Sequence, residues 1–264
     1  MYLKIAAGYE IYYEEYGKGY PVLFLPGILG DRLTFQSIIN RLKAQYRCIS
    51  VELAGQGSTI IDSRNLKENF SIDEHTEAIR FLIKSLELSK IHIIGLSFGS
   101  IIAVNFAYKY KGMVDKICLL GALLVNKTKR YENWNILWEL CSNNLDLLAR
   151  LSIGLVYSEN FLKKTPNLFD LTKERLSILK ANQLQAFRWN IQHARSFDMQ
   201  KPFNEIHSSV LCIHGEEDII HPIKELKGYI KNKKNVELFT IPDVGHGLHV
   251  EAPEIITKKI QEHL

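Results

Sequence analysis

The segment Gly95-Leu96-Ser97-Phe98-Gly99 places a serine in a turn whose backbone conformation is constrained by the residues on both sides. The apolar run 91–94 predicts a short buried strand, and the small and apolar residues of 100–110 predict a helix packed on a sheet. A serine between them lies in a tight turn, where glycines on both sides relieve backbone clashes. Glycine-flanked serines also recur by chance, so the strand and helix carry the prediction of a nucleophile elbow; the alternative is an incidental serine in an ordinary turn.

Strand and helix patterns alternate through the first half of the chain and again near its end. Residues 34–45 and 72–88 have helical patterns, and residues 10–15 alternate like a strand of an antiparallel hairpin. Strands separated by helices predict a parallel sheet with right-handed crossovers. The other predicted strands are 22–25, 47–53, 91–94, 116–120, 209–214 and 236–241.

The alternation stops between about residue 122 and residue 205. This stretch has no strand-like run, and helical patterns cover residues 134–148, 171–185 and 187–197. We therefore predict an α/β core made of residues 1–121 and 206–264, with residues 122–205 inserted above the sheet as a helical cap.

The predicted cap contains all three tryptophans of the chain. Trp134 and Trp138 are four residues apart, so they would share one face of a helix. Such aromatic side chains usually join a helix to the core, but some of them should line an apolar pocket. The candidate pocket residues are Trp134, Trp138, Phe161 and Trp189.

Composition predicts one large core with an insertion, since 46% of the 264 residues are hydrophobic and 23% are charged. No apolar run approaches the roughly 18 residues that span a bilayer. The first residues lack the pattern of a signal peptide, so we expect no membrane span and a cytoplasmic location. The four cysteines form no pair with metal-ligand spacing, and we expect no metal, disulfide or cofactor.

The formal net charge of +4 is too small and too dispersed to predict nucleic-acid binding. Residues 122–205, however, hold twelve Lys and Arg residues against eight Asp and Glu residues. This excess would guide an acidic partner to the cap. The plainer interpretation is a solvated surface.

A serine hydroxyl is a poor nucleophile at neutral pH, so it needs a base and a group that orients the base. The loop containing Asp218 follows the strand that ends at His214, and the loop containing His246 follows the strand that ends at Ile241. Both loops lie at the carboxyl edge of a parallel sheet, as Ser97 does. We therefore predict Ser97 as nucleophile, His246 as base and Asp218 as orienting acid.

Other acids and histidines compete for these roles. Glycines on both sides of His246 would let its loop bring the imidazole toward the serine, whereas His249 begins the last helical pattern and should pack or cap there. Motif context favours Asp218 over its two acidic neighbours. Histidines within or at the end of strands are usually buried and hydrogen-bonded. The remaining competitors are Glu216, Glu217, His214 and His92.

An oxyanion formed next to Ser97 would need two amide donors. The amide of Phe98 opens the predicted helix and points toward the reacting group. The turn Pro26-Gly27-Ile28-Leu29-Gly30 follows a predicted strand, and its glycines let a second amide, that of Ile28, aim at the same place. The alternative is an ordinary glycine turn.

With these parts assembled, the chain resembles the α/β-hydrolase superfamily over nearly its full length. This resemblance implies a mostly parallel eight-stranded sheet flanked by helices, with a helical cap. The residues that carry it are the elbow Gly95-Leu96-Ser97-Phe98-Gly99, the turn Val51-Glu52-Leu53-Ala54-Gly55-Gln56-Gly57-Ser58, the acid turn Ile213-His214-Gly215-Glu216-Glu217-Asp218 and the histidine loop Gly245-His246-Gly247-Leu248-His249-Val250-Glu251-Ala252-Pro253.

The chain departs from the family pattern at two positions. The oxyanion turn usually reads His-Gly and here reads Pro26-Gly27, which removes a supporting imidazole and leaves the amide donor. The acid of the turn at 51–58 is usually Asp and here is Glu52. In the histidine loop, the family pattern makes His249 a non-catalytic position, which favours His246 as the base.

The resemblance implies a serine hydrolase that cleaves a carboxylic ester or thioester with an apolar acyl group, through an acyl-enzyme. A serine at the elbow argues against haloalkane dehalogenases and epoxide hydrolases, which use aspartate there. An acyltransferase with the same acyl-enzyme, a carbon-carbon bond hydrolase and a ligand sensor without turnover remain alternatives. The expected partner is a small-molecule ester or thioester. The basic cap also suggests an acyl carrier protein, as in the carrier-linked methyl esterases that this chain is similar to.

Overall fold

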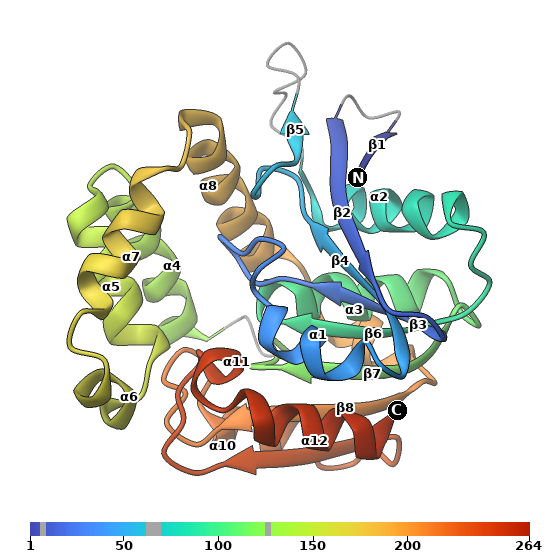
Figure 1. Ribbon diagram of the computed structural model, residues 1–264. Helices are drawn as coiled ribbons and strands as arrows, with labels where there is room; N and C mark the ends of the chain where they lie inside the picture. The colour runs from blue at the N-terminus through green and yellow to red at the C-terminus, as the bar shows by residue number, and fades with distance from the viewer. Residues whose placement is uncertain (6–8, 62–69, 125–127) are drawn as a thin grey trace.

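The computed structural model describes residues 1–5, 9–61, 70–124 and 128–264. Their strands form one sheet whose strands run in the order β1-β2-β4-β3-β6-β7-β8-β9, with the short β5 paired to β2 (Figure 1). In chain order these strands are β1 (Tyr2–Ile5), β2 (Tyr9–Tyr16), β3 (Tyr20–Leu25), β4 (Tyr46–Glu52), β5 (Ile60–Ile61), β6 (Ile91–Leu96), β7 (Val114–Leu120), β8 (Ser209–Gly215) and β9 (Val236–Ile241).

Helices cover both faces of the sheet, and a separate group of helices stands beyond its carboxyl edge (Figure 1). They are α1 (Gln36–Leu42), α2 (Ile72–Ser85), α3 (Phe98–Lys109), α4 (Lys129–Cys141), α5 (Leu145–Val156), α6 (Glu159–Lys164), α7 (Leu168–Ser177), α8 (Ala181–Ser196), α9 (Gln200–Glu205), α10 (Ile223–Ile230), α11 (Leu248–Glu251) and α12 (Pro253–His263). In the described part of the chain, no helix is long and apolar enough to span a membrane.

The predicted fold is confirmed. The six strands from β4 through β3 to β9 pair in parallel, and β2 pairs antiparallel with β1, β4 and β5. The central strands carry near-continuous apolar runs because both of their faces are buried. The sequence patterns missed β1 and β5, which are too short for an alternation to be recognised.

Two apolar clusters hold the helices on the sheet. One lies between the sheet and α2, α3 and α10, where Ile79, Ile102 and Leu226 are buried. The other lies under α1 and α12, around Ile39 and Ile256. Because the two clusters fix the sheet from both faces, the loops at its carboxyl edge rest on a rigid support.

The helices between β7 and β8 differ from the predicted pattern in two places. The predicted helix 134–148 is wrong, because α4 ends before this range is complete and a new helix, α5, begins after a short turn. The Asn144 side chain accepts hydrogen bonds from the amides of Asp146 and Leu147 and thereby caps α5. The predicted helix 171–185 is wrong as well, since Lys180 is extended and α8 begins after it. Apolar periodicity continues across both breaks, so it did not reveal them.

A small third core joins α5, α7 and α8 beyond the carboxyl edge of the sheet (Figure 1), while Ala186 and Ala194 of α8 and Tyr131 of α4 pack into the main core. Its buried members are Leu148, Ala149, Leu176, Phe187 and Ile191. The last helix of this segment, α9, instead packs on α3 and belongs to the main core. The boundary of the cap at residue 205 stays a prediction, and the packing of α9 favours an earlier end, after α8.

A buried hydrogen bond ties the cap to the core. The imidazole of His75 on α2 lies with Nε2 2.9 Å from Oδ1 of Asn190 on α8, and both side chains are buried. The ring of His75 also packs edge-on against Phe98, at 5.5 Å between ring centroids. Burial lowers the pKa of His75 to about 4, so this imidazole is neutral at neutral pH.

We predict opposite effects of alanine at two helical glycines. A Cβ at Gly99 would lie 2.2 Å from the carbonyl oxygen of Leu25, so Gly99→Ala should lower the free energy of unfolding by about 1–3 kcal/mol. A Cβ at Gly154 on α5 would meet no atom within 4 Å, so Gly154→Ala should raise it by about 0.5–1 kcal/mol. Urea denaturation measures both, and equal effects would contradict the packing described for α3.

We also predict that His75 makes stability pH-dependent. Since its pKa is lower in the folded state, unfolding takes up a proton between about pH 6.5 and 4, and the free energy of unfolding falls as the pH falls through that window. His75→Gln keeps a donor for Asn190 but cannot titrate. Its slope of stability against pH should be smaller by about 1.4 kcal/mol per pH unit. Identical slopes in denaturant titrations at pH 6 and 4.5 would contradict a buried neutral imidazole.

Candidate active site

The turn between β6 and α3 places Ser97 in a strained left-handed conformation, with φ 49° and ψ −112°. Such a conformation costs about 1–3 kcal/mol for a residue with a side chain. The surrounding backbone holds it, because the Ser97 amide donates to the carbonyl oxygen of Leu120 (2.9 Å), and the Ser97 carbonyl accepts from both the amide and the hydroxyl of Ser100. The hydroxyl of Ser97 is thereby presented at the carboxyl edge of the sheet.

Close packing explains the two glycines of the elbow. A Cβ at Gly95 would lie 2.7 Å from the carbonyl oxygen of Gly99, and one at Gly99 would collide with the end of β3. Neither glycine has a positive φ in this structure. Their role is therefore steric: α3 starts directly against β6 and β3, and no side chain fits between them.

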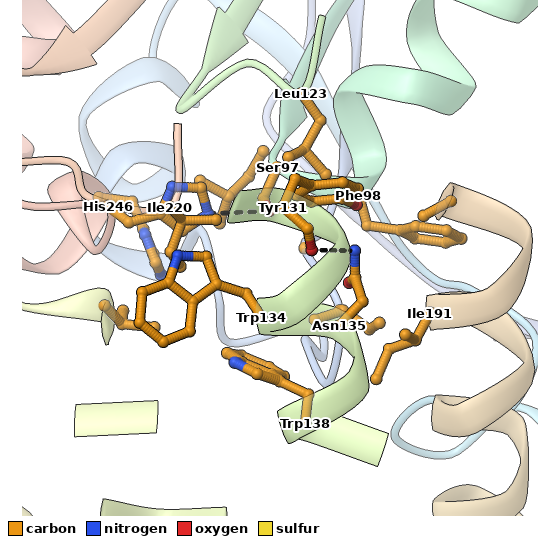
Figure 2. A pocket seen from close by; sticks show the side chains of 16 residues that line it. Ser97, Phe98, Leu123, Tyr131, Trp134, Asn135, Trp138, Ile191, Ile220 and His246 are labelled. Atoms are coloured by element: carbon orange, nitrogen blue, oxygen red, sulfur yellow. Dashed lines mark hydrogen bonds between the residues drawn. The ribbon is translucent and has the colours of Figure 1, made fainter. Parts of the chain in front are cut away.

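Ser97, His246 and Asp218 form a continuous chain of hydrogen bonds (Figure 2 shows the Ser97–His246 contact). His246 Nε2 lies 2.9 Å from Ser97 Oγ, and His246 Nδ1 lies 2.7 Å from Asp218 Oδ2. The other carboxylate oxygen of Asp218 accepts from the amides of Ile220 and His221. With Nδ1–H donating to Asp218, Nε2 is free to accept the proton of the Ser97 hydroxyl.

Asp218 is anionic at neutral pH although it is buried. Burial raises the pKa of its carboxyl, while the charge and the hydrogen bond of His246, followed by the charges of His214 and His221, lower it and together outweigh burial. The net result is a pKa of about 2. A permanent carboxylate at this position fixes the tautomer of His246 and stabilises the imidazolium that would form when His246 takes a proton.

The competing acids lie away from His246. The carboxylates of Glu216 and Glu217 are exposed, and they accept from the hydroxyl of Thr240 and the amide of Glu159. His92 lies at the opposite end of β6, with its ring 4.3 Å from that of Tyr20. None of these groups contacts Ser97.

The competing histidines near the triad are neutral; His214 is buried and His249 is half-buried. The ring of His249 packs beside that of Phe35 and lines a cavity next to Ser97. Burial lowers the pKa of His249 to about 3. His214 Nε2 lies 2.6 Å from the carbonyl oxygen of His221 and 3.3 Å from Asp218 Oδ2. His214 thus supports the acid turn, a role that its position at the end of a strand did not reveal.

Sequence reasoning assigned the wrong cause to the glycines around His246. Neither has a positive φ, but a Cβ at Gly245 would lie 2.8 Å from the amide nitrogen of Ser158, and one at Gly247 would lie 2.7 Å from the ring of Tyr157. These glycines let the segment between α5 and α6 pack directly on the histidine loop. They are needed for contact with the cap rather than for freedom of the loop.

The proposed oxyanion donors lie on either side of Ser97. Phe98 begins α3, and both Phe98 and Ile28 line the same cavity as Ser97. A Cβ at Gly27 would come 3.5 Å from the Cβ of Ser97, so the turn after β3 approaches the elbow closely. The side-chain amide of Gln56 donates a hydrogen bond to the carbonyl oxygen of Gly27 (2.9 Å) and so stabilises this turn.

Glu52, one of the two departures from the family pattern, is a fully buried carboxylate beside the oxyanion turn. It accepts hydrogen bonds from the amides of Arg32 and Ser58, and the Arg32 guanidinium lies 3.5 Å away. Gly57 has a positive φ and lies so close to Glu52 that a Cβ would collide with it. The glutamate therefore joins the loop after β4 to the loop after β3.

An apolar cavity of about 130 Å³ opens beside Ser97, between the sheet edge and α4 and α8. Figure 2 shows Trp134 and Trp138 from α4 on its wall. Tyr131 and Asn135 come from the same helix, and the Asn135 side chain donates to the Tyr131 carbonyl (2.9 Å). The wall of the cavity is mostly apolar, and Asn135 is a polar side chain on it that was not among the residues predicted from the sequence.

The other two candidate pocket residues lie elsewhere. Trp189 on α8 packs against Phe70, at 5.8 Å between ring centroids, and contributes to the main core. Phe161 on α6 stacks on Tyr157 and lines a separate groove behind the histidine loop. Both face away from the cavity because their helices turn them toward the core and toward β9.

A second cavity, of about 360 Å³, lies under α5 and α7 and shares Ile28, Trp138 and His249 with the first. Arg175 lines its wall, with Nη2 3.2 Å from Asp31 Oδ2. The two cavities therefore adjoin the oxyanion turn from different sides. In the described residues, no group of three His, Cys, Asp or Glu side chains is placed to hold a metal ion.

Known proteins resemble this chain in sequence and in fold. The chain matches the family model described as alpha/beta hydrolase fold over residues 20–253. It is 26% identical over 274 residues to AB hydrolase superfamily protein YisY of Bacillus subtilis, covering 99% of this chain and 97% of that protein. It is also 24% identical over 261 residues to Protein PHYLLO, chloroplastic, of Arabidopsis thaliana, covering 90% of this chain but 15% of that protein.

A solved structure of a thermophilic esterase from Thermogutta terrifontis is similar as well, with a TM-score of 0.83, 23% identity, and coverage of 96% of this chain and 92% of that one. At that identity the likeness shows a shared fold. Since the family model matches most of the chain, the protein belongs to the α/β hydrolase family.

We predict that Asp218→Asn slows the reaction of Ser97 with a fluorophosphonate about 10³- to 10⁴-fold at pH 7. The new amide would donate to His246 Nδ1, which leaves the proton on Nε2, where it cannot accept from Ser97. The measurement is the rate of covalent labelling, with the unfolding temperature as control. A labelling rate within tenfold of wild type, in a folded variant, would contradict the role of Asp218.

Proposed function

We propose that this protein is a serine hydrolase that cleaves a carboxylic ester or thioester through an acyl-enzyme. The observation that carries the proposal is the Asp218–His246–Ser97 hydrogen-bond chain at the wall of an apolar cavity. The family supports hydrolase chemistry, and the Thermogutta terrifontis esterase shows that this fold can carry ester hydrolysis. The ester specificity and the acyl-enzyme are our inference from the site.

The proposed reaction follows from the geometry. Ser97 Oγ attacks the acyl carbonyl carbon while His246 Nε2 takes its proton, and the amides of Ile28 and Phe98 stabilise the oxyanion. His246 then gives this proton to the leaving alcohol or thiol, and an acyl-Ser97 ester remains. Water, deprotonated by His246, attacks the ester and releases the acid. Asp218 stays ionised throughout and orients His246.

The cavity points to a short apolar acyl group. Its volume of about 130 Å³ is smaller than that of the second cavity, which is about 360 Å³. Trp138 has the largest side chain among the six residues that line both this cavity and the larger second one; the others are Gly27, Ile28, Leu96, Val156 and His249. A long chain would therefore need Trp138 to move, or would have to leave the first cavity.

We predict that 4-nitrophenyl esters graded from acetate to dodecanoate give the highest kcat/KM near butyrate. Trp138→Ala removes the largest side chain that lines both cavities and should move the optimum to longer chains. Trp189→Phe is the matched control, since Trp189 lies outside both cavities, and it should leave the profile unchanged. A flat profile, or the same shift in the control, would contradict this account of the cavity.

The same panel separates the alternatives. Ester turnover that Ser97→Ala retains would overturn the proposal, as would a wild-type protein that neither cleaves esters nor reacts with a fluorophosphonate. Diversion of the acyl group to added alcohols would identify an acyltransferase. Cleavage of a diketone without ester cleavage would identify a carbon-carbon bond hydrolase. Ligand binding without any turnover would identify a sensor.

The carrier of the acyl group and the location of the protein stay predictions. Several basic side chains of the cap already form ion pairs with acidic neighbours, including Lys173 with Asp146 and Lys163 with Glu159. These pairs favour a solvated surface over a docking site for an acyl carrier protein. A cytoplasmic location rests on the sequence pattern alone.

A further inference from the structure

The loop that carries His246 is held on both sides of the histidine. The amide of Gly247 donates to the carbonyl oxygen of Val156, at 2.6 Å, and Val156 is the last residue of α5. The amide of Gly245 donates to Oε1 of Glu251, at 3.1 Å, and Glu251 is the last residue of α11. One contact with the cap and one with Glu251 are therefore among the contacts that position His246.

Glu251 also binds the cap. The hydroxyl of Ser158 donates to Oε2 of Glu251, at 2.5 Å, and the amide of Ser158 lies 3.3 Å from both carboxylate oxygens. Ser158 is buried, and its hydroxyl accepts from the amide of Phe161, which caps α6. One carboxylate thus joins the histidine loop to the first turn of a cap helix.

The donors to Glu251 are a hydroxyl and two backbone amides, all uncharged. The net pKa of the Glu251 carboxyl is raised. Burial is the largest cause, the hydrogen bonds from Ser158 and Gly245 lower the pKa, and nearby Glu217 raises it. A carboxylate in this setting is held by geometry rather than by a counter-ion. An amide of the same shape is therefore a direct test of its hydrogen bonds.

We propose that Glu251 is a positioning residue that couples the cap to the catalytic base. By holding Gly245 and Ser158 together, it keeps His246 within reach of Ser97 when the cap is docked. Glu251 touches neither Ser97 nor the cavity beside it, so it acts through the histidine loop. This inference rests on the proposed function, in which His246 is the base that activates Ser97.

The test compares Glu251→Ala, Glu251→Gln and Ser158→Ala in ester hydrolysis. A displacement of about 1 Å in a catalytic group can cost about 10²-fold in rate, so Glu251→Ala should lower kcat about 10- to 100-fold, with a smaller change in KM. In Glu251→Gln the side-chain oxygen can still accept from the Gly245 amide, and the Ser158 hydroxyl can accept from the new N–H instead of donating, so this variant should keep at least about a third of kcat. The double variant that combines Ser158→Ala with Glu251→Ala should have a kcat close to that of Glu251→Ala, because both substitutions remove the same contact between Ser158 and Glu251.

Glu217→Gln is the matched control. Its carboxylate also accepts from the cap, at the amide of Glu159, but makes no hydrogen bond to Gly245. This variant should keep wild-type kcat. Labelling of Ser97 by a fluorophosphonate is measured in every variant, together with the unfolding temperature, and should slow in Glu251→Ala in parallel with kcat.

Two results would overturn the coupling. One is a Glu251→Ala variant with a lower unfolding temperature but with kcat and labelling within twofold of wild type, since Glu251 would then be structural only. The other is a Glu251→Gln variant as slow as Glu251→Ala, since an acceptor for the Gly245 amide would then not be what preserves the rate. A wild-type protein that is neither labelled nor active would instead overturn the proposed function, which is a distinguishable outcome.

Discussion

The left-handed backbone of Ser97 is the constraint on which this site depends. Its strain of about 1–3 kcal/mol persists because β3, β6, β7 and the start of α3 meet around it. The two glycines of the elbow let these elements approach, and the bond to the Leu120 carbonyl fixes the turn to β7. Ser97 and Phe98, the first residue of α3, then line the same cavity at the carboxyl edge of the sheet.

The parallel strand order brings the other parts of the site to this edge. β8 and β9 end beside the elbow with Asp218 and His246 in their loops, and β3 ends there with the oxyanion turn. Buried polar groups then lock these loops to one another. Glu52 and Gln56 hold the oxyanion turn, and His214 supports the acid turn. The sheet and its loops form a rigid support. The cap has a small core of its own and joins this support through apolar contacts, such as that of Trp189 with Phe70, and through buried polar ones.

Local patterns carry the parts of the fold and site that sequence reasoning could predict. A buried strand, a glycine-flanked turn and the loops after β8 and β9 are each visible in a few neighbouring residues. Contacts between segments that are distant in the sequence cannot be predicted from such local patterns. Asn144 looks like a helical residue until its side chain caps α5, and Trp189 looks like a pocket residue until Phe70 packs on it. The contact of Gly245 with Ser158 likewise depends on how the cap lies on the core.

The central claim is that Ser97 carries the acyl group during turnover, and rapid-quench mass spectrometry tests it directly. Protein mixed with a short-chain ester and quenched within the first turnovers should gain the mass of one acyl group, on the peptide that contains Ser97. Ser97→Ala should gain none and should not turn the ester over. Turnover without an adduct in the wild type, or an adduct on another residue that Ser97→Ala retains, would contradict the account.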